Sequence, residues 1–406
     1  CFSLFDGFGF PQEHMDFAHG NGSKALALTD HGSMNGLSYQ LLRAKEMKAE
    51  GKDFKPIFGI EAYYIESIDE WRVMKAEMSA DKKRAKQIDT SKSAMVIEDE
   101  QRNDKRALSQ KRHLVLLAQN QKGLENIYEM VSKSYTGDYF YRKPRIDWAM
   151  LKKHSEGVIV LTACLGGIGA ACMWENQEAG EDVIVKSMAD SFAKFKDTFG
   201  DRFYAELQWN NIPEQHLLNR CLIKVAKQLE LKLVSTCDSH YPRPDAWKDR
   251  EVYKRLGWLG KMPEWMDENI PSSVDEIGYE LYPKNAHEMW ESYKRYSNDL
   301  NIDYDDDLVL ESITATADIA FRQIEDFLPD TSIQLPSFMV PSDKSADEAL
   351  AELADKALSV LLRGETKTTK RQYRRRLDTE LDVISSQKFS EYFLATKAIT
   401  DFSWNY

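Results

Sequence analysis

Short apolar runs alternate with amphipathic helical patterns over the first two thirds of the chain, and this alternation limits the possible folds more than any other feature. Residues 213–229 are typical of the helical patterns, with a proline in the first turn and apolar residues along one stripe. The alternation predicts an α/β fold with parallel strands and right-handed crossovers, closed as a barrel or open as a sheet. The expected strands are 25–29, 56–64, 114–118, 157–162, 203–208 and 232–236.

Composition sets further limits. With 42% apolar residues, the 406-residue chain can bury a substantial core. Its net charge of -12 means that any contact with nucleic acid must come from local basic patches. Five scattered cysteines argue against a disulfide framework and for a reducing compartment. The longest charge-free run, 157–174, contains several glycines and does not predict a membrane span.

The domain organisation is read from changes in composition. The charged stretch 65–112 interrupts the alternation and is expected to be a solvated, partly helical insertion in a first domain at 1–265. Prolines then become frequent, which predicts a linker region at 266–340. Helices follow at 341–406, where Ser345 and Glu348 form a capping box and the apolar residues of 346–361 predict a buried stripe.

Side chains able to bind a metal stand at the ends of most expected strands. The carboxyl ends of parallel barrel strands share one rim, so these side chains are expected to converge there. His113 fits less well, because it precedes its strand. A mixture of N, O and S ligands suits zinc, and the carboxylates would also accept manganese. The candidates are His31, Glu61, His113, Cys164, Asp238 and His240.

Each of these residues also has a plainer interpretation. A single histidine at a strand end is more often a hydrogen-bonded loop residue, a single cysteine is usually a small buried apolar residue, and Asp238 could cap a helix. The convergence of several ligand types on strand ends favours the metal site. The other histidines are expected at the surface: His14, His19, His154, His216 and His287.

Several motifs, in order over nearly the whole chain, resemble a known family. Segments 25–36, 55–61, 113–118, 144–147 and 157–167 are similar to the PHP (polymerase and histidinol phosphatase) domain at the N-terminus of bacterial and phage DNA polymerase III alpha subunits, the C-family polymerases. Segments 338–341 and 389–394 resemble the entry into that family's palm. The resemblance implies a distorted (β/α)7 barrel followed by a mostly helical segment that begins the palm.

The resemblance also implies a metal centre of up to three zinc or manganese ions at the barrel mouth. Its ligands, carried over by position, would be Asp6, His31, Glu61, His113, Cys164, Asp238 and His240. The family pattern has a His-x-His pair just before the motif that holds Asp6, and this sequence begins at Cys1, after that place. We hypothesise that Cys1 follows an intein, and a truncated sequence is the alternative. Without the pair, weak metal binding and slow hydrolysis are expected.

For the parent protein the resemblance implies replicative DNA synthesis, with a PHP site that acts as a metal-dependent 3′–5′ exonuclease. Expected partners are primer–template DNA, a sliding clamp and a proofreading subunit, in the cytoplasm of a bacterium or a phage-infected cell. The polymerase site and its magnesium ions are expected outside this sequence. Asp303 and Asp305 have the spacing of a carboxylate pair, but no glycine loop is nearby and a solvated loop is the better interpretation.

Two other functions stay open. The PHP domain could be a non-catalytic scaffold that stabilises the polymerase and docks a proofreading subunit, although all seven visible positions keep ligand-type residues. The chain could also be a stand-alone small-molecule phosphatase, but the insertion and the palm-like last third argue against that. A basic run between Lys367 and Arg376 could contact DNA, and a solvated helix face is the preferred interpretation.

Overall fold

The computed structural model describes residues 2–88, 107–260, 269–332, 337–340 and 343–404. The chain forms two compact units, Cys1–Pro329 and Asp330–Tyr406. In the described residues all strands and all candidate ligands belong to the first unit, and the second unit consists of helices and loops. None of the described helices is long and apolar enough to cross a membrane.

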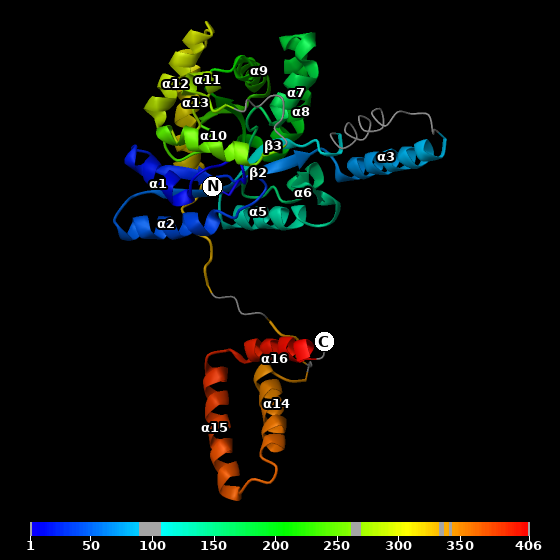
Figure 1. Cartoon of the computed structure of the whole chain (residues 1–406). Coiled ribbons are helices and arrows are strands. Elements are labelled where there is room, and N and C mark those ends of the chain that lie inside the picture. The colour runs from blue at the N-terminus through cyan, green and yellow to red at the C-terminus, as the bar shows by residue number, and fades with distance from the viewer. Residues whose placement is uncertain (1, 89–106, 261–268, 333–336, 341–342, 405–406) are drawn as a thin grey trace. The chain divides into compact units, whose positions relative to one another are not determined.

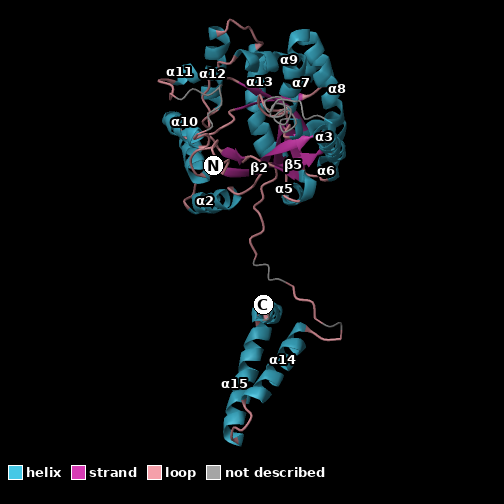
Figure 2. Ribbon diagram, turned by 45° about the vertical axis from the view of Figure 1, so that its right-hand side comes forward, coloured by secondary structure: helices cyan, strands magenta, loops and turns pink. Residues whose placement is uncertain are grey.

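One curled sheet forms the centre of the first unit, with helices packed around it (Figure 1, Figure 2). Its order is β4-β5-β2-β3-β6-β7-β8, and β1 pairs with β2 off this path. The expected α/β fold is confirmed, and the six expected strands agree with the observed bounds to within two residues. The strands are β1 (Ala25–Leu28), β2 (Lys55–Ile65), β3 (Arg112–Ala118), β4 (Phe140–Tyr141), β5 (Lys143–Asp147), β6 (Val158–Leu161), β7 (Phe203–Gln208) and β8 (Lys232–Thr236).

Two strands differ from the expectation of a parallel sheet, and one of them is the short β4, which runs antiparallel to β5. β3 runs antiparallel to both of its neighbours, β2 and β6. β1 and β5 are parallel to β2, and β6, β7 and β8 are parallel to one another. The charged insertion joins the end of β2 to the start of β3, so it serves as the long connection of a hairpin rather than as a crossover.

Helices cover the outer face of the sheet and complete the main hydrophobic core. Phe192 and Phe195 of one helix pack on Phe203 of β7, and all three rings are buried. The helices of the first unit are α1 (Pro11–Gly20), α2 (Leu37–Ala49), α3 (Ile68–Ile88), α5 (Gln121–Ser134), α6 (Trp148–Lys153), α7 (Ile168–Asn176), α8 (Glu181–Phe199), α9 (Pro213–Leu229), α10 (Trp247–Leu256), α11 (Val274–Ile277), α12 (Ala286–Asp299) and α13 (Asp306–Asp318).

Strand pairing does not close the curled sheet. In the described residues β1 pairs only with β2 and β8 only with β7, so their free edges remain. α13 packs beside β8, and Ile319 and Ala320 after it join an inner apolar cluster with Ile57 and Val234. A cavity of about 470 Å³ lies inside the curl and reaches from residues of β1, such as Leu26, to the rim of the sheet.

The first unit extends past the boundary expected near residue 265. α12 and α13 place Met289, Tyr293, Val309 and Ile313 in the main core. The described residues between 269 and 329 are therefore part of the folded unit rather than a linker. The prolines of this region suggested loops, but its apolar side chains at helical spacing form helices that pack into the core.

The insertion is less solvated at its base than expected. Ile68 and Trp71 of α3 and Leu108 form a small buried cluster. Trp71 donates a hydrogen bond from its indole nitrogen to the Leu108 carbonyl oxygen over 2.9 Å. Residues 89–106 of the expected insertion lie outside the described residues.

Three histidines expected at the surface are buried: His14, His154 and His216. Nε2 of His14 lies 3.0 Å from the Phe8 carbonyl oxygen, and both ring nitrogens of His216 have hydrogen-bond partners. Burial lowers the pKa of His14 to about 3, so its ring is neutral at pH 7. The Tyr304 hydroxyl group that contacts His216 lies 88 residues further along the chain, which is why the sequence pattern did not indicate burial of that ring.

Three helices make up most of the second unit: α14 (Ala346–Leu361), α15 (Lys367–Ser386) and α16 (Ser390–Trp404). The capping box of Ser345 and Glu348 is confirmed at the start of α14. The buried stripe expected in α14 is wrong, because no residue of this helix is buried and Leu361 is 71% exposed. Three helices offer too little surface to cover one another's apolar faces.

Candidate metal centre

The seven candidate ligands lie at one rim of the curled sheet, and the strand directions explain why. His31 follows β1 and forms a bridge with Glu61 of β2. His113 is the second residue of β3, and because β3 is antiparallel to β2, its first residues lie at the rim where the parallel strands end. The position of His113 before its strand, which suits a parallel sheet poorly, therefore follows from the direction of β3.

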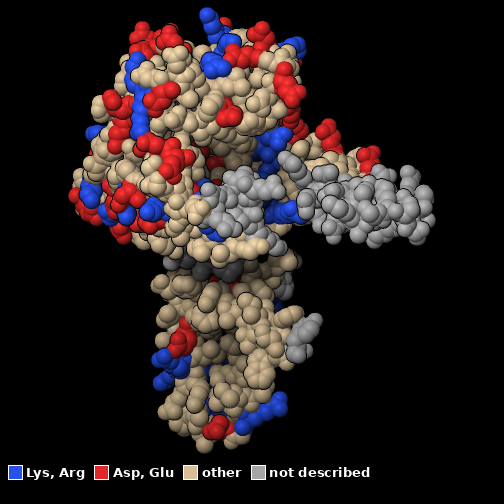
Figure 3. Space-filling view, turned by 45° about the horizontal axis from the view of Figure 1, so that its top comes forward, with Lys and Arg blue, Asp and Glu red and all other residues tan. Residues whose placement is uncertain are grey.

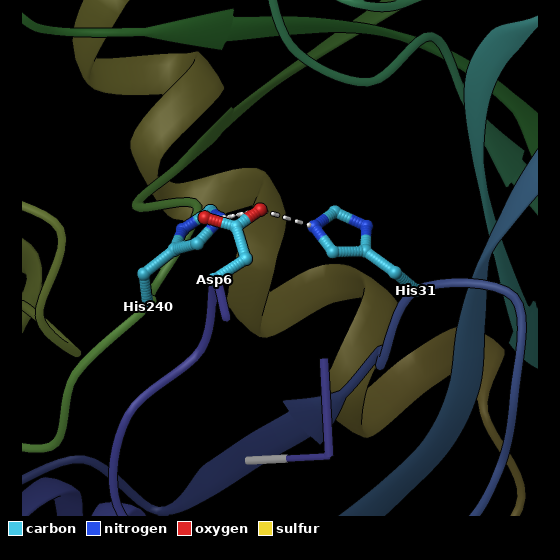
Figure 4. A group of neighbouring side chains, drawn as sticks. All are labelled: Asp6, His31 and His240. Carbon is cyan, nitrogen blue, oxygen red and sulfur yellow. Dashed lines mark hydrogen bonds and ion pairs between the residues drawn. The ribbon is translucent and has the colours of Figure 1, made fainter. Parts of the chain in front are cut away.

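Asp6 stands between two histidines (Figure 4). Its Oδ2 atom lies 3.0 Å from Nε2 of His31 and 3.7 Å from Nε2 of His240, which follows β8. Arg250 of α10 donates hydrogen bonds to the carbonyl oxygen and Oδ1 of Asp6, at 2.8 Å and 2.6 Å, and so fixes the N-terminal turn at the rim. Asp6, His31 and His240 thus offer one oxygen and two nitrogens close enough to share a cation.

Glu61 joins His31 to His113. Its Oε2 atom lies 3.3 Å from Nδ1 of His31, and its Oε1 atom contacts Nδ1 of His113. His31 faces Asp6 with one ring nitrogen and Glu61 with the other, so it belongs to both ligand groups. The two groups therefore form one continuous polar cluster.

Cys164 and Asp238 lie at the edges of this cluster. The Cys164 sulfur is 3.6 Å from Nδ1 of His113 and 4.0 Å from Oε1 of Glu61. Oδ1 of Asp238 is 3.7 Å from Nδ1 of His240. Asp238 and Ala163 have positive φ angles of 47° and 62°, a costly conformation that turns the chain at this rim. All seven residues predicted from the sequence are brought together.

The electrostatics of the cluster follow from alternating acids and imidazoles. Burial opposes ionisation of Asp6, but His240 and His31 outweigh it and hold the pKa of this carboxyl well below its usual range. Burial alone would lower the pKa of His31, whereas Glu61 and Asp6 raise it to about 9. Burial raises the pKa of the Cys164 thiol, with Asp238 and Glu61 adding to the effect. Without a cation the cluster holds His31 protonated and Cys164 as a thiol.

The sequence matches the PHP domain family over residues 1–210. The chain belongs to the PHP domain family. It is 35% identical over 397 residues to the DNA polymerase III subunit alpha of Aquifex aeolicus, an alignment covering 97% of this chain and 30% of the relative. The alpha subunit of Campylobacter jejuni is 28% identical, with 97% and 30% covered, and that of Thermus aquaticus is 31% identical, with 62% and 17% covered. The chain thus spans about 30% of the length of the relatives that match nearly all of it.

The residues present in this PHP domain fit a borderline divalent cation. The cluster combines carboxylate oxygens, imidazole nitrogens and one thiol, which is the donor set that zinc prefers and that manganese accepts in part. Nδ1 of His31 is buried and has no hydrogen bond of good geometry in the described residues, although Glu61 is close. A cation between them would satisfy both groups.

One acidic residue of the rim was missed at the sequence level. Glu206 lies in β7 and is 3% exposed. Its Oε2 accepts a hydrogen bond from the Ala163 amide over 3.0 Å, and its Oε1 accepts one from Thr236 over 2.5 Å. It therefore ties the turn before Cys164 to the end of β8, just before Asp238. The same rule that selected Glu61, an acid near the end of an expected strand, would have found it.

Proposed function

We propose that this PHP domain belongs to a bacterial or phage DNA polymerase III alpha subunit and hydrolyses phosphodiester bonds at the 3′ end of DNA in a metal-dependent reaction. The continuous cluster of carboxylates, imidazoles and a thiol at the rim carries the proposal. The alignment of nearly the whole chain with alpha subunits supports DNA as the substrate. The zinc or manganese site would use all seven residues predicted from the sequence.

The roles of the residues follow from their positions. Bound zinc or manganese supplies an acidified water and positive charge for the phosphate. Asp6, His31 and His240 would hold a cation on one side of the cluster, and Glu61 and His113 on the other, with Cys164 and Asp238 beside them. Arg250 orients Asp6 through two hydrogen bonds. Glu61 is 4% exposed, so bulk water is excluded from the inner side of the cluster.

DNA synthesis, with its magnesium ions, is proposed for the parent protein and not for this part of it. The acidic pair Asp303 and Asp305 does not build a polymerase site, because Asp305 caps α13 by accepting hydrogen bonds from two amides of that helix. Primer–template DNA, a sliding clamp and a separate proofreading subunit are the partners we propose for the parent protein.

A scaffold without catalysis is the second candidate, and one observation favours it. Asp6 and Glu61 are already paired with imidazoles and, for Asp6, with Arg250. The cluster therefore compensates its own charges without a cation, as a structural polar network would. In that case the polar cluster at the rim stabilises the domain, and the domain itself catalyses no reaction.

The full chain, incubated with Mn²⁺ or Zn²⁺ and single-stranded DNA labelled at the 5′ end, tests the proposal. We expect slow stepwise shortening from the 3′ end, lost on chelation and reduced at least about 100-fold in His31→Ala. His287→Ala, an exposed histidine outside the cluster, is the matched control. Metal binding without any shortening would favour the scaffold, and faster hydrolysis of a small phosphate monoester than of DNA would favour a phosphatase.

A further inference from the structure

Two lysines lie over a single aromatic ring beside the rim. Nζ of Lys111 is 5.1 Å and Nζ of Lys143 is 5.6 Å from the ring centroid of Tyr63. The same ring stacks on His31, with centroids 6.0 Å apart, and lies 5.5 Å from the ring of His113. We call Tyr63, Lys111 and Lys143 the lysine shelf. The shelf is adjacent to the ligand cluster because the Tyr63 ring contacts two proposed ligands, His31 and His113.

The register of the sheet produces this arrangement. Tyr63 of β2 pairs with His113 on one side and with Arg145 of β5 on the other. Lys111 and Lys143 each precede one of these partners by two residues, so they belong to the face that carries Tyr63. Glu61 lies two residues before Tyr63 on the same strand and face. One face of β2 therefore leads from the ligand cluster directly to the shelf.

The positive charge of the shelf is not neutralised within the described part of the chain, where neither ammonium group forms an ion pair with a carboxylate. Both ammonium groups lie over the same ring, that of Tyr63. The cations thus repel one another, and an anion between them would relieve this repulsion. Basic side chains lie beside the hollow in the visible face of the first unit (Figure 3).

We propose that the lysine shelf binds the phosphate backbone of single-stranded nucleic acid whose end enters the ligand cluster. Tyr63 is only 5% exposed, so its ring positions the lysines and has no free face for a base. Recognition is therefore by charge and independent of base sequence. A single strand fits better than a duplex, because Glu61 in the ligand cluster is buried. Only the end of a separated strand can reach a buried position of this kind. The strand's direction toward the cluster rests on the proposed function, whereas phosphate binding at the shelf does not.

The salt dependence of binding measures these contacts. Fluorescence anisotropy of a labelled oligothymidylate with the full chain, in EDTA to prevent hydrolysis, gives the affinity at several salt concentrations. Two lost phosphate contacts make the slope of log affinity against log salt less steep by about 1.4, at about 0.7 per contact on a single strand. We expect this change in the variant carrying K111Q and K143Q. An unchanged slope in that variant would overturn the proposal, as would failure of the wild-type chain to bind.

Lys227→Gln is the matched control. Lys227 is an exposed lysine near the C-terminal end of α9, and β8 begins directly after this helix. Because the rim lies at the other end of β8, Lys227 is remote from the ligand cluster. We expect the slope for Lys227→Gln to equal that of the wild type. If the slope becomes less steep by the same amount in both variants, the effect comes from the overall charge of the protein, which would contradict a binding site at the shelf. If DNA binds with the predicted slopes but is never shortened when Mn²⁺ is added, the shelf stands and the proposed hydrolysis fails.

Discussion

Residues 1–329 and 330–406 use their apolar side chains in opposite ways. The first unit buries large clusters around its sheet, including the fully buried rings of Phe192 and Phe195. In the described residues of the second unit only Leu362, Ser390 and Leu394 are buried. The helices of the second unit are thus specified by local signals, whereas the rim of the first unit is held by a core. A polar cluster is held more precisely in the first kind of structure.

The largest expected difference between the units is in the cost of removing an apolar side chain. Phe192→Ala should lower the free energy of unfolding of the first unit by about 3–5 kcal/mol, because it leaves a cavity between α8 and the sheet. Leu361→Ala, at an exposed position of α14, should change stability by less than about 0.5 kcal/mol. Chemical denaturation of both variants measures the contrast. Similar losses in the two would show that the second unit has a core of its own.

Metal should stabilise the first unit alone. At a free zinc or manganese concentration of about 100 times the dissociation constant, binding adds about 2.7 kcal/mol to the folded state. Hydrogen exchange followed by mass spectrometry should show slower exchange in β1, β2 and β8 and no change in α14 to α16. In His31→Ala the added metal should have no effect on exchange. Slower exchange confined to the second unit would place the metal elsewhere.

Acid should weaken the first unit through His14. Its pKa is about 3 in the folded chain and about 6.5 when unfolded, so the unfolded state takes up the proton first as the pH falls. The stability from the neutral ring is complete above pH 6.5 and is lost as the pH falls toward 3, by about 2 kcal/mol at pH 5. His14→Gln should lack this component when denaturation at pH 7 and pH 5 is compared. An identical pH dependence of variant and wild type would contradict the assignment.

The smallest effect concerns the capping box of the second unit. Ser345→Ala removes the hydroxyl that accepts a hydrogen bond from the Glu348 amide, which should cost about 1 kcal/mol. Because α14 has no buried residue to hold it, this loss should appear as roughly fivefold faster amide exchange in its first turns. Thr366→Ala at the start of α15 should act in the same way on that helix alone. Unchanged exchange in both would mean that tertiary contacts hold these helices.

The sequence predicted the parts of the fold that depend on local patterns. The strands at 203–208 and 232–236 and the helix at 213–229 are found with the expected bounds. The direction of β3 could not be predicted, because an apolar run such as 114–118 carries no information about direction. Once β3 is known to be antiparallel, His113 joins the rim as naturally as His31.

Burial by distant segments was the other feature that the sequence did not reveal. His216 is buried because Tyr304, 88 residues away, supplies a partner for its ring. The leucines of α14 follow a helical stripe but none of them is buried, since α15 and α16 do not cover them. Glu206 was overlooked although it stands near a strand end, because the strand around it was treated as apolar. Periodicity identifies which side of an element is apolar, and only the assembled fold decides what covers it.

The metal content of the purified full chain tests the central claim most directly, because His31 belongs to both ligand groups. Wild type, His31→Ala and the control His287→Ala would be dialysed to equilibrium against zinc or manganese, because weakly bound metal is lost on desalting. The metal on the two sides of the membrane would then be compared by mass spectrometry of the elements. We expect an excess of metal on the protein side for the wild type and for His287→Ala, and its loss in His31→Ala. Equal metal content in His31→Ala and wild type would contradict a metal centre at the rim.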